Sequence, residues 1–337
     1  MNVLVTGATS LLGAETVRRL QHAGNDVRTF QRRPSGLGTI ESLGSVEDGA
    51  AVLDAMDGAE AVVHLAARVG VTGPWEAYRQ VNVLGTENVI TAARTLDVQR
   101  LVHVSSPSVA HAGASLVGAG AEPANPERAR GHYARSKAMA EISVLGSASD
   151  VAVVAIRPHL VWGPGDTQLV GRIVDRARAG RLAHIGPGTA LIDTTYVTNA
   201  ADALVAAVER SPDLNGSAFV VTNGQPRPVG EIIDRIVAAA GLPSTTKRVP
   251  TSLAKFGGAG IERYWERTGR EDDPPMTRFV AEQLSTAHWF DQSETQEALG
   301  WVPEVTLDEG FEDLRSWYAQ QDQSTNVSPL RSAASDA

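Results

Sequence analysis

Short runs of β-branched and other apolar residues alternate with helical patterns through the first half of the chain. The runs that predict strands are Val3–Val5, Val27–Phe30, Ala61–Leu65, Leu101–Val104 and Val151–Ile156. Between them, apolar residues recur at spacings of three and four, as on one face of a helix. This order predicts an α/β fold with a Rossmann-type, doubly wound parallel sheet.

The pattern becomes less regular after Pro158. Gly-Pro-Gly runs at 163–165 and 186–188 interrupt the chain. Helical stretches such as Val229–Ala240 then follow without regular strands between them. Because glycine and proline break periodic structure, this half predicts a smaller, mainly helical lobe.

These changes of pattern divide the chain into three parts. We expect a dinucleotide-binding domain over residues 1–158, with 190–225 packing back on it. The substrate lobe is expected to comprise 159–189 and 226–318. Residues 319–337 are rich in Ser, Gln, Asp and Ala. That composition buries little apolar surface and predicts a disordered tail.

Composition excludes several classes of site and partner. The 337 residues include no cysteine, which excludes disulfides, thiolate metal sites and a cysteine nucleophile. The eight histidines show no metal-ligand spacing, so no metal is expected. A net charge of −9 opposes nucleic-acid binding. Without a signal peptide or a long apolar stretch, we expect a cytoplasmic protein with no integral membrane segment.

A glycine-containing turn follows the first predicted strand and leads into a helix. Gly7 permits a tight turn, and Gly13 lets the helix approach the sheet. The first turn of such a helix presents free backbone N–H groups to a pyrophosphate. The residues expected to bind a dinucleotide here are Gly7, Thr9, Ser10, Leu11, Leu12 and Gly13.

The exit of the second predicted strand indicates which dinucleotide is preferred. It reads Phe30-Gln31-Arg32-Arg33-Pro34 and holds no carboxylate for the ribose 2′-hydroxyl of NAD. An arginine at this place accommodates the 2′-phosphate of NADP. Arg32 therefore favours NADP(H) over NAD(H). The alternative is a pair of solvated surface arginines.

A tyrosine and a lysine stand four positions apart in a predicted helix. Tyr133 and Lys137 therefore share one face, in a chain that has only five tyrosines and three lysines. A nearby ammonium favours the phenolate, so we expect Lys137 to lower the pKa of Tyr133. Tyr133 would then exchange a proton with a substrate oxygen, and Lys137 would also hold the cofactor ribose. The alternative is an exposed pair without a catalytic role.

Hydroxyl groups follow the fourth predicted strand. A serine there can hydrogen-bond the reacting oxygen and orient it toward the phenol. We choose Ser106, although spacing alone does not separate it from Ser105 or Ser108.

Together these features resemble the extended short-chain dehydrogenase/reductase superfamily over residues 1 to about 318. Within it the chain resembles the 3β-hydroxysteroid dehydrogenase branch, and most closely the bacterial 2-alkyl-3-oxoalkanoate reductases of olefin biosynthesis. The motifs that carry the resemblance are Thr6-Gly7 to Gly13, His64-Leu65-Ala66-Ala67, Ser105-Ser106-Pro107-Ser108-Val109, Tyr133-x3-Lys137, Trp162-Gly163-Pro164-Gly165-Asp166, Thr195-Tyr196-Val197-x-Asn199 and Thr222-Asn223-Gly224-Gln225-Pro226.

The resemblance implies a catalytic set and further cofactor contacts. Ser106, Tyr133 and Lys137 would be catalytic. Additional cofactor-binding residues would be Leu65, Ala66, Ala67 and Pro158. The chain departs from the family at Ser10, where the turn normally has its middle glycine. It departs again at Gly44-Ser45, where a Gly-Asp pair normally contacts adenine.

The expected function is NAD(P)-dependent interconversion of a 3-oxo and a 3-hydroxy group on a bulky apolar substrate, which could carry a carboxylate. Candidate lining aromatics are Trp162, Phe256, Trp265, Phe279, Trp289 and Phe290, and candidate carboxylate ligands are Arg172, Arg176, Arg178 and Arg181. Residues 251–267 read as a covering helix or a membrane-touching one. A homodimer is left open. The alternatives are a nucleotide-sugar epimerase or dehydratase with tightly held NAD, and a non-catalytic NADP(H) sensor.

Overall fold

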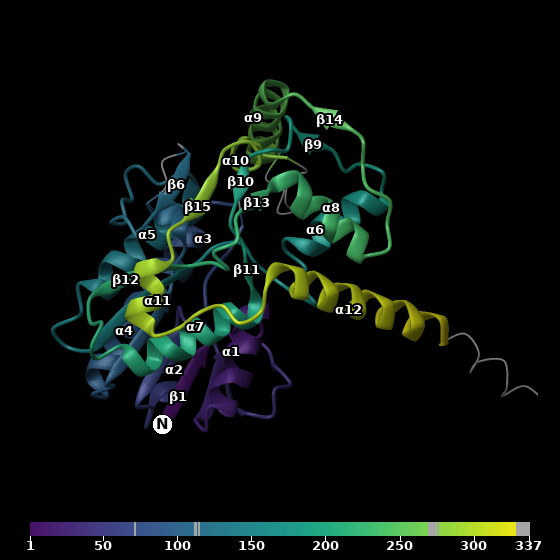
Figure 1. Cartoon of the computed structure of the whole chain (residues 1–337). Helices are drawn as coiled ribbons and strands as arrows, with labels where there is room; N and C mark the ends of the chain where they lie inside the picture. The colour runs from purple at the N-terminus through teal and green to yellow at the C-terminus, as the bar shows by residue number, and fades with distance from the viewer. Residues whose placement is uncertain (71, 111–112, 114, 269–273, 275, 328–337) are drawn as a thin grey trace, which may run out of the picture.

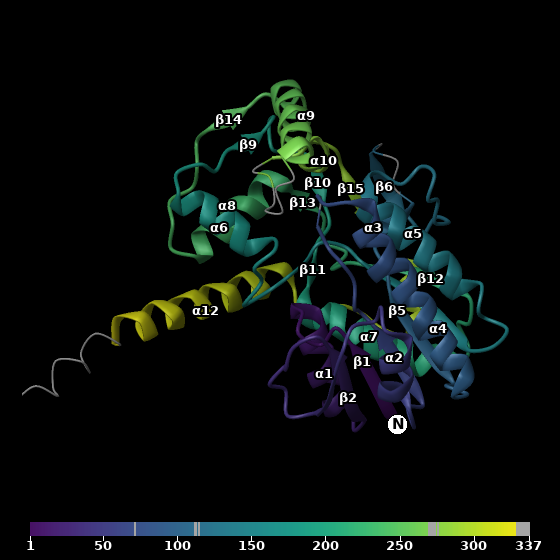
Figure 2. The same cartoon turned by 180° about the vertical axis from the view of Figure 1, so that it is seen from behind.

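The structure is a computed structural model that describes residues 1–70, 72–110, 113, 115–268, 274 and 276–327. A large parallel sheet with helices on both faces forms one part, and a lobe of helices and short strands covers one end of it (Figures 1 and 2). The chain crosses between these two parts several times.

The sheet has seven strands, all parallel, in the order β12-β7-β5-β4-β1-β2-β3. This confirms the predicted fold class. The strands are β1 (Asn2–Thr6), β2 (Asp26–Gln31), β3 (Ile40–Leu43), β4 (Ala61–His64), β5 (Arg100–Val104), β7 (Ala152–Pro158) and β12 (Ser217–Val221). The apolar pattern predicted five of these seven and missed the two edge strands, β3 and β12. The strand order reverses between β1 and β4, which is where such sheets bind ligands.

Alternation along β1 shows how the two faces are covered. Val3 and Val5 pack in one core with α1 (Leu11–His22) and α7 (Val197–Arg210). Leu4 points the other way, into a second core. The helices on that side are α2 (Gly49–Met56), α4 (Gly85–Thr95) and α5 (Gly131–Leu145). Successive side chains of a strand face opposite sides, so a wholly apolar strand needs helices on both.

The lobe contains more strand than the sequence pattern predicted. Its strands, each two to four residues long, are β6 (Leu116–Ala119), β8 (Val161–Trp162), β9 (His184–Ile185), β10 (Leu191–Ile192), β11 (Thr195–Tyr196), β13 (Arg227–Pro228), β14 (Arg248–Val249) and β15 (His288–Phe290). Segments this short carry no recognisable alternation. Its helices include α6 (Val170–Arg178), α8 (Val229–Ala239), α9 (Thr251–Thr268) and α10 (Arg278–Gln283).

The sequence analysis expects a disordered tail from residue 319, and this start is too early. Helix α12 runs from Leu307 to Val327, well past position 319. Its first half buries Leu307, Phe311 and Leu314 in the core of the lobe. A helix nucleated by such packing propagates readily through the alanine and glutamine residues that follow. Residues 328–337 lie outside the described part of the chain.

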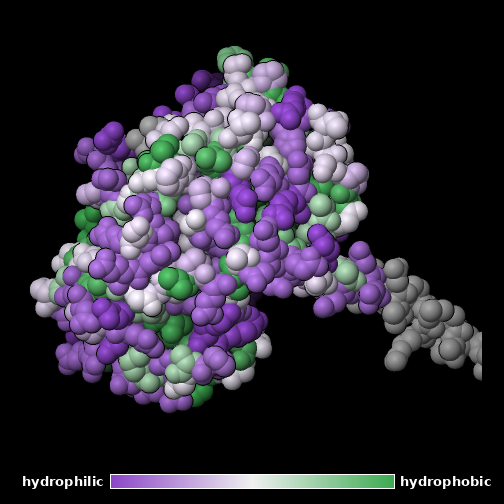
Figure 3. All heavy atoms as spheres, in the orientation of Figure 1, coloured by the Kyte–Doolittle hydropathy of each residue, from purple (hydrophilic) through white to green (hydrophobic). Residues whose placement is uncertain are grey.

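Helix α9 covers the far end of the lobe (Figure 1). Phe256 and Leu253 on it are 82% and 61% exposed, on a surface that is otherwise mainly hydrophilic in the view of Figure 3. Within the described ranges, no helix combines the length and apolarity that a membrane span requires.

Candidate active site

Close backbone approach explains both glycines of the turn after β1. Gly7 has a φ of +76°, and a Cβ on it would lie 2.8 Å from the amide nitrogen of Ala66. A Cβ on Gly13 would lie 2.4 Å from the carbonyl oxygen of Gly7. No side chain fits either distance. The turn therefore brings β1, the start of α1 and the segment after β4 together at the switch point of the sheet.

Ser10 caps helix α1. Its hydroxyl accepts a hydrogen bond from the amide of Gly13 and donates one to the carbonyl of Gly7, both at 3.0 Å. The side chain is thus folded back onto the turn. The backbone N–H groups of Leu11 and Leu12 are in the first turn, where no carbonyl of the helix can accept from them. They can therefore donate hydrogen bonds to a bound anion. A serine in place of the family's glycine is therefore compatible with a pyrophosphate.

The segment after β4 is tied to the same turn. The amide of Ala66 donates to Thr6 Oγ1 at 3.1 Å, and Thr6 Oγ1 lies 2.8 Å from His64 Nδ1. The backbone of Leu65 and Ala66 therefore lies beside Gly7, and Ala67 follows directly. Pro158 ends β7, two strands from β4 along the same edge of the sheet.

Arg32 follows β2, the neighbour of β1. Its side chain is exposed, and it makes no ion pair with any residue of the described ranges. A guanidinium at the carboxyl end of the second strand remains available to a phosphate.

The three serines after β5 differ in their surroundings. Ser105 is buried, and its hydroxyl has no hydrogen-bond partner in the described structure. Ser106 begins the short helix η2 (Pro107–Val109), with its hydroxyl 2.9 Å from that of Ser108. Helix η2 packs against α5, and the Ser106 hydroxyl interacts with the phenol of Tyr133. The structure thus separates Ser106 from Ser105, which spacing alone could not do.

Lys137 is buried beneath the end of β5. Its amine donates to the carbonyl of Val104 at 2.5 Å and lies 3.2 Å from His103 Nε2. Burial disfavours the ammonium and lowers the pKa of Lys137 to about 7, while the carboxylate of Glu141 opposes that change.

Tyr133 is half-buried one helical turn before Lys137. Burial raises the pKa of Tyr133 to about 12, although its interaction with Ser106 works in the opposite direction. The expectation that Lys137 lowers this pKa is therefore wrong for the chain by itself. Desolvation of the phenolate dominates, and the amine that was to oppose it is directed to Val104 and His103.

Sequence reasoning missed a buried hydrogen-bond network that links the turn after β1 to helix α5. His64 Nε2 lies 3.1 Å from Thr86 Oγ1, and Thr86 donates to the carbonyl of Asn82. The Asn82 side chain donates to Ser136, which donates to the carbonyl of Tyr133. The Asn-x3-Thr spacing in a helix was the available signal, because residues four apart are neighbours there.

The aromatic and arginine side chains expected to contact the substrate lie in different parts of the structure. Trp162 is fully buried, stacked on Phe311 with ring centroids 4.6 Å apart, so it belongs to the core of the lobe. Phe256 projects into solvent. Arg178 lies over the ring of Tyr318 in the lobe. The side chain of Phe279 falls outside the described residues.

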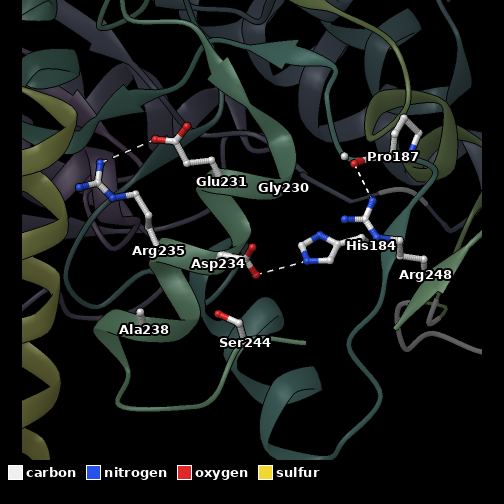
Figure 4. A pocket seen from close by; sticks show the side chains of 10 residues that line it. His184, Pro187, Gly230, Glu231, Asp234, Arg235, Ala238, Ser244 and Arg248 are labelled. Carbon is white, nitrogen blue, oxygen red and sulfur yellow. Dashed lines mark hydrogen bonds and ion pairs between the residues drawn. The ribbon is translucent and has the colours of Figure 1, made fainter. Parts of the chain in front are cut away.

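A hollow of about 540 Å³ lies between α8, β9 and β14 (Figure 4). His184 Nε2 is 3.2 Å from Asp234 Oδ1 in it, and Arg248 donates to the carbonyl of Pro187. None of the predicted site residues lines this hollow. It is separate from the site around Tyr133.

The sequence has close relatives with known activities. Residues 4–250 match the model of the 3-beta hydroxysteroid dehydrogenase/isomerase family. The chain is 40% identical to a 2-alkyl-3-oxoalkanoate reductase of Stenotrophomonas maltophilia, over 94% of this chain and 99% of that protein. It is 28% identical to a 3-beta-hydroxysteroid dehydrogenase of Mycolicibacterium neoaurum, over 94% of this chain and 91% of the relative.

A solved structure of MoeE5 in complex with UDP-glucose and NAD has a TM-score of 0.75 and 25% identity to this chain. The similarity covers 95% of this chain and 99% of MoeE5. Together with the family match, it supports a nicotinamide dinucleotide as the cofactor. The chain belongs to the 3-beta hydroxysteroid dehydrogenase/isomerase family and is an NAD(P)-dependent oxidoreductase.

Proposed function

We propose that this protein reduces the 3-oxo group of a 2-alkyl-3-oxoalkanoic acid to the 3-hydroxy acid, with NADPH as reductant. The observation that carries the proposal is the 40% identity to a reductase of that name over nearly the whole of both chains. The catalytic set Ser106, Tyr133 and Lys137 is the part of the site that the reaction needs.

The residues of the switch point have the binding roles. The turn from Gly7 to Gly13 would hold the pyrophosphate, Leu65, Ala66, Ala67 and Pro158 would contact the nucleotide, and Arg32 would take the 2′-phosphate. When bound, the nicotinamide supplies the hydride that reduces the carbonyl carbon.

Proton transfer falls to the chain's own residues. Ser106 would hydrogen-bond the carbonyl oxygen and hold it toward Tyr133. A phenol with a pKa of about 12 stays protonated at neutral pH, so Tyr133 can donate its proton to the oxygen as negative charge develops there. Lys137, one helical turn away and hydrogen-bonded to the carbonyl of Val104, would hold the cofactor ribose as an ammonium.

The pH dependence of kcat/KM for NADPH should show the protonation state of Lys137. Because the pKa of Lys137 in the free chain is about 7, its ammonium form is present below that pH and is lost above it. We expect kcat/KM to fall as pH rises through about 7. Tyr133 cannot produce that limb, since its pKa is far higher. A flat profile between pH 6 and 8 would remove Lys137 from this role.

Arg32 decides between the two nucleotides in this proposal. Arg32→Ala should weaken NADPH about tenfold or more and leave NADH within about twofold, because only NADPH carries the phosphate that the guanidinium pairs with. Fluorescence titration of both nucleotides measures this. Arg33→Ala is the matched control on the same exposed segment. Equal losses for NADPH and NADH would show that Arg32 does not read the 2′-phosphate.

Two further functions deserve a direct test. The identity to a 3-beta-hydroxysteroid dehydrogenase favours a steroid, and the fold similarity to MoeE5, whose solved complex holds UDP-glucose, favours a nucleotide sugar. Nucleotide oxidation separates the three when 3-oxo acids, 3-ketosteroids and UDP-sugars are screened with NADPH and NADH. Net NADPH oxidation with a 3-oxo acid is expected. Conversion of a UDP-sugar without net nucleotide change would instead indicate an epimerase.

A further inference from the structure

Arg68 stands on the segment that leaves β4 toward the catalytic helix. Its backbone is held on both sides by one buried side chain: the amide of Arg68 donates to Asn82 Oδ1 at 2.6 Å, and Asn82 Nδ2 donates to the carbonyl of Arg68 at 3.0 Å. Asn82 also donates to Ser136 on α5. The position of Arg68 is therefore fixed relative to the helix that carries Tyr133.

The guanidinium of Arg68 contacts an aromatic side chain that lies near Tyr133. It stacks over the ring of Tyr78 in α3 (Trp75–Tyr78), 5.3 Å from the ring centroid. Tyr78 in turn is near enough to Tyr133 to raise the pKa of its phenol through their charges. Helix α3 also packs against α5. Gly73 also lies against the guanidinium, because a Cβ on it would be 3.0 Å from Arg68 Nη2.

Arg68 has no acidic partner, unlike two other arginines near α5. Arg130 is ion-paired with Glu282, and Arg157 with Glu141. Arg68 forms no ion pair with any residue that the structure describes, and its side chain is exposed. The ring of Tyr78 lies against the cation, and the N–H edge of the guanidinium has no hydrogen-bond partner among the residues that the structure describes. That edge is the part of a guanidinium that binds a carboxylate in two parallel hydrogen bonds.

We propose that Arg68 binds the carboxylate of the substrate and so selects acids over neutral ketones. This inference rests on the proposed function. In a 2-alkyl-3-oxo acid the carboxyl group is separated from the reacting carbonyl carbon by C2 alone. The cation that holds it must therefore lie near Tyr133, and Arg68 is connected to that region through Tyr78 of α3, a helix that packs against α5. Arg178 is over Tyr318 in the lobe instead, and Arg172 is hydrogen-bonded to Gln168.

The test compares an acid with its neutral ester in the oxidative direction, where the substrates are stable. A 2-alkyl-3-hydroxyalkanoic acid and its methyl ester are oxidised with NADP+, and kcat and KM are measured for wild type, Arg68→Met and Arg68→Lys. We expect Arg68→Met to lower kcat/KM for the acid about 10- to 100-fold, mainly through KM, and to change that for the ester less than threefold. Arg68→Lys should recover part of the loss.

Arg135→Met is the matched control. Arg135 is also an exposed arginine stacked on an aromatic ring, 4.7 Å from the centroid of Trp75. The Arg135→Met variant should leave the ratio of kcat/KM for the acid to kcat/KM for the ester unchanged. Equal losses for acid and ester in Arg68→Met would show a structural role through Tyr78 and overturn the proposal, as would an unchanged preference for the acid.

A binding measurement separates this proposal from the proposed function. Calorimetry with NADP+-loaded protein compares a long-chain fatty acid with its methyl ester, neither of which can react. Tighter binding of the acid in wild type, lost in Arg68→Met, supports the carboxylate site even if no 3-hydroxy acid is oxidised, and in that case only the proposed reaction fails. Equal binding of acid and ester by wild type overturns the proposal for Arg68.

Discussion

Tyr133→Phe should lower kcat by at least about 100-fold while NADPH binding stays within a few-fold. The substitution removes only the hydroxyl, which is the proton donor in the proposed reaction, and general acid catalysis contributes about 10²- to 10⁴-fold. The ring remains to fill its half-buried place on α5. Stopped-flow single turnovers with saturating NADPH give the rate, and fluorescence titration gives nucleotide affinity.

Tyr78→Phe is the control for Tyr133→Phe. The Tyr78 hydroxyl donates to the carbonyl of Thr72 and takes no part in the proposed proton transfer. Its loss should change kcat less than about tenfold. Retention of wild-type turnover by Tyr133→Phe would exclude Tyr133 as the proton donor, whatever the control does.

Glu141→Ala should destabilise the protein by about 3–5 kcal/mol, because it leaves the guanidinium of Arg157 buried without its partner. The side chains of Arg157 and Glu141 are 1% and 0% exposed. They form a bidentate ion pair between β7 and α5. Arg157 also donates to the carbonyl of Glu122. Chemical denaturation monitored by tryptophan fluorescence gives the free energy of unfolding.

The double variant Glu141→Leu with Arg157→Met tests the cause of that loss. Replacing both members of a buried pair by apolar side chains removes the uncompensated charge, so the double variant should be more stable than Glu141→Ala. If the single variant lost less than about 1 kcal/mol, the pair would not be anchoring α5 to the sheet.

The sequence predicted the interior of the sheet because its strands are buried on both faces. Val3–Val5 and Val151–Ile156 are nearly continuous apolar runs, which few other elements produce. Strand β3 carries no such signal. It lies at the edge, where Ile40 and Leu43 are 73% and 56% exposed, and only its pairing with β2 defines it. The short strands of the lobe are likewise products of tertiary pairing.

Motif spacing gives the residues of the candidate site, whose roles stay predictions, but it does not give their electrostatics. The four-residue separation of Tyr133 and Lys137 is fixed by the helix. Their pKa values depend on how much water reaches each group, and that is decided by residues far away in sequence, such as His103 beside the lysine. The choice of Ser106 over Ser105 depends on which way each side chain turns at the end of β5. Asn82 joins Arg68 to α5 across more than 50 positions, at Ser136, so no local pattern contains it.

Tyr133, Lys137 and Glu141 follow one another at intervals of four along a single helix. The residues proposed for catalysis and the residue that attaches α5 to β7 therefore lie on the same face of the helix. Engineering for heat resistance has little freedom on that face, because a substitution that strengthens the attachment to β7 also changes the charge felt by Lys137. The outward face of the same helix, where Ile142 is 48% exposed, can be redesigned without that coupling.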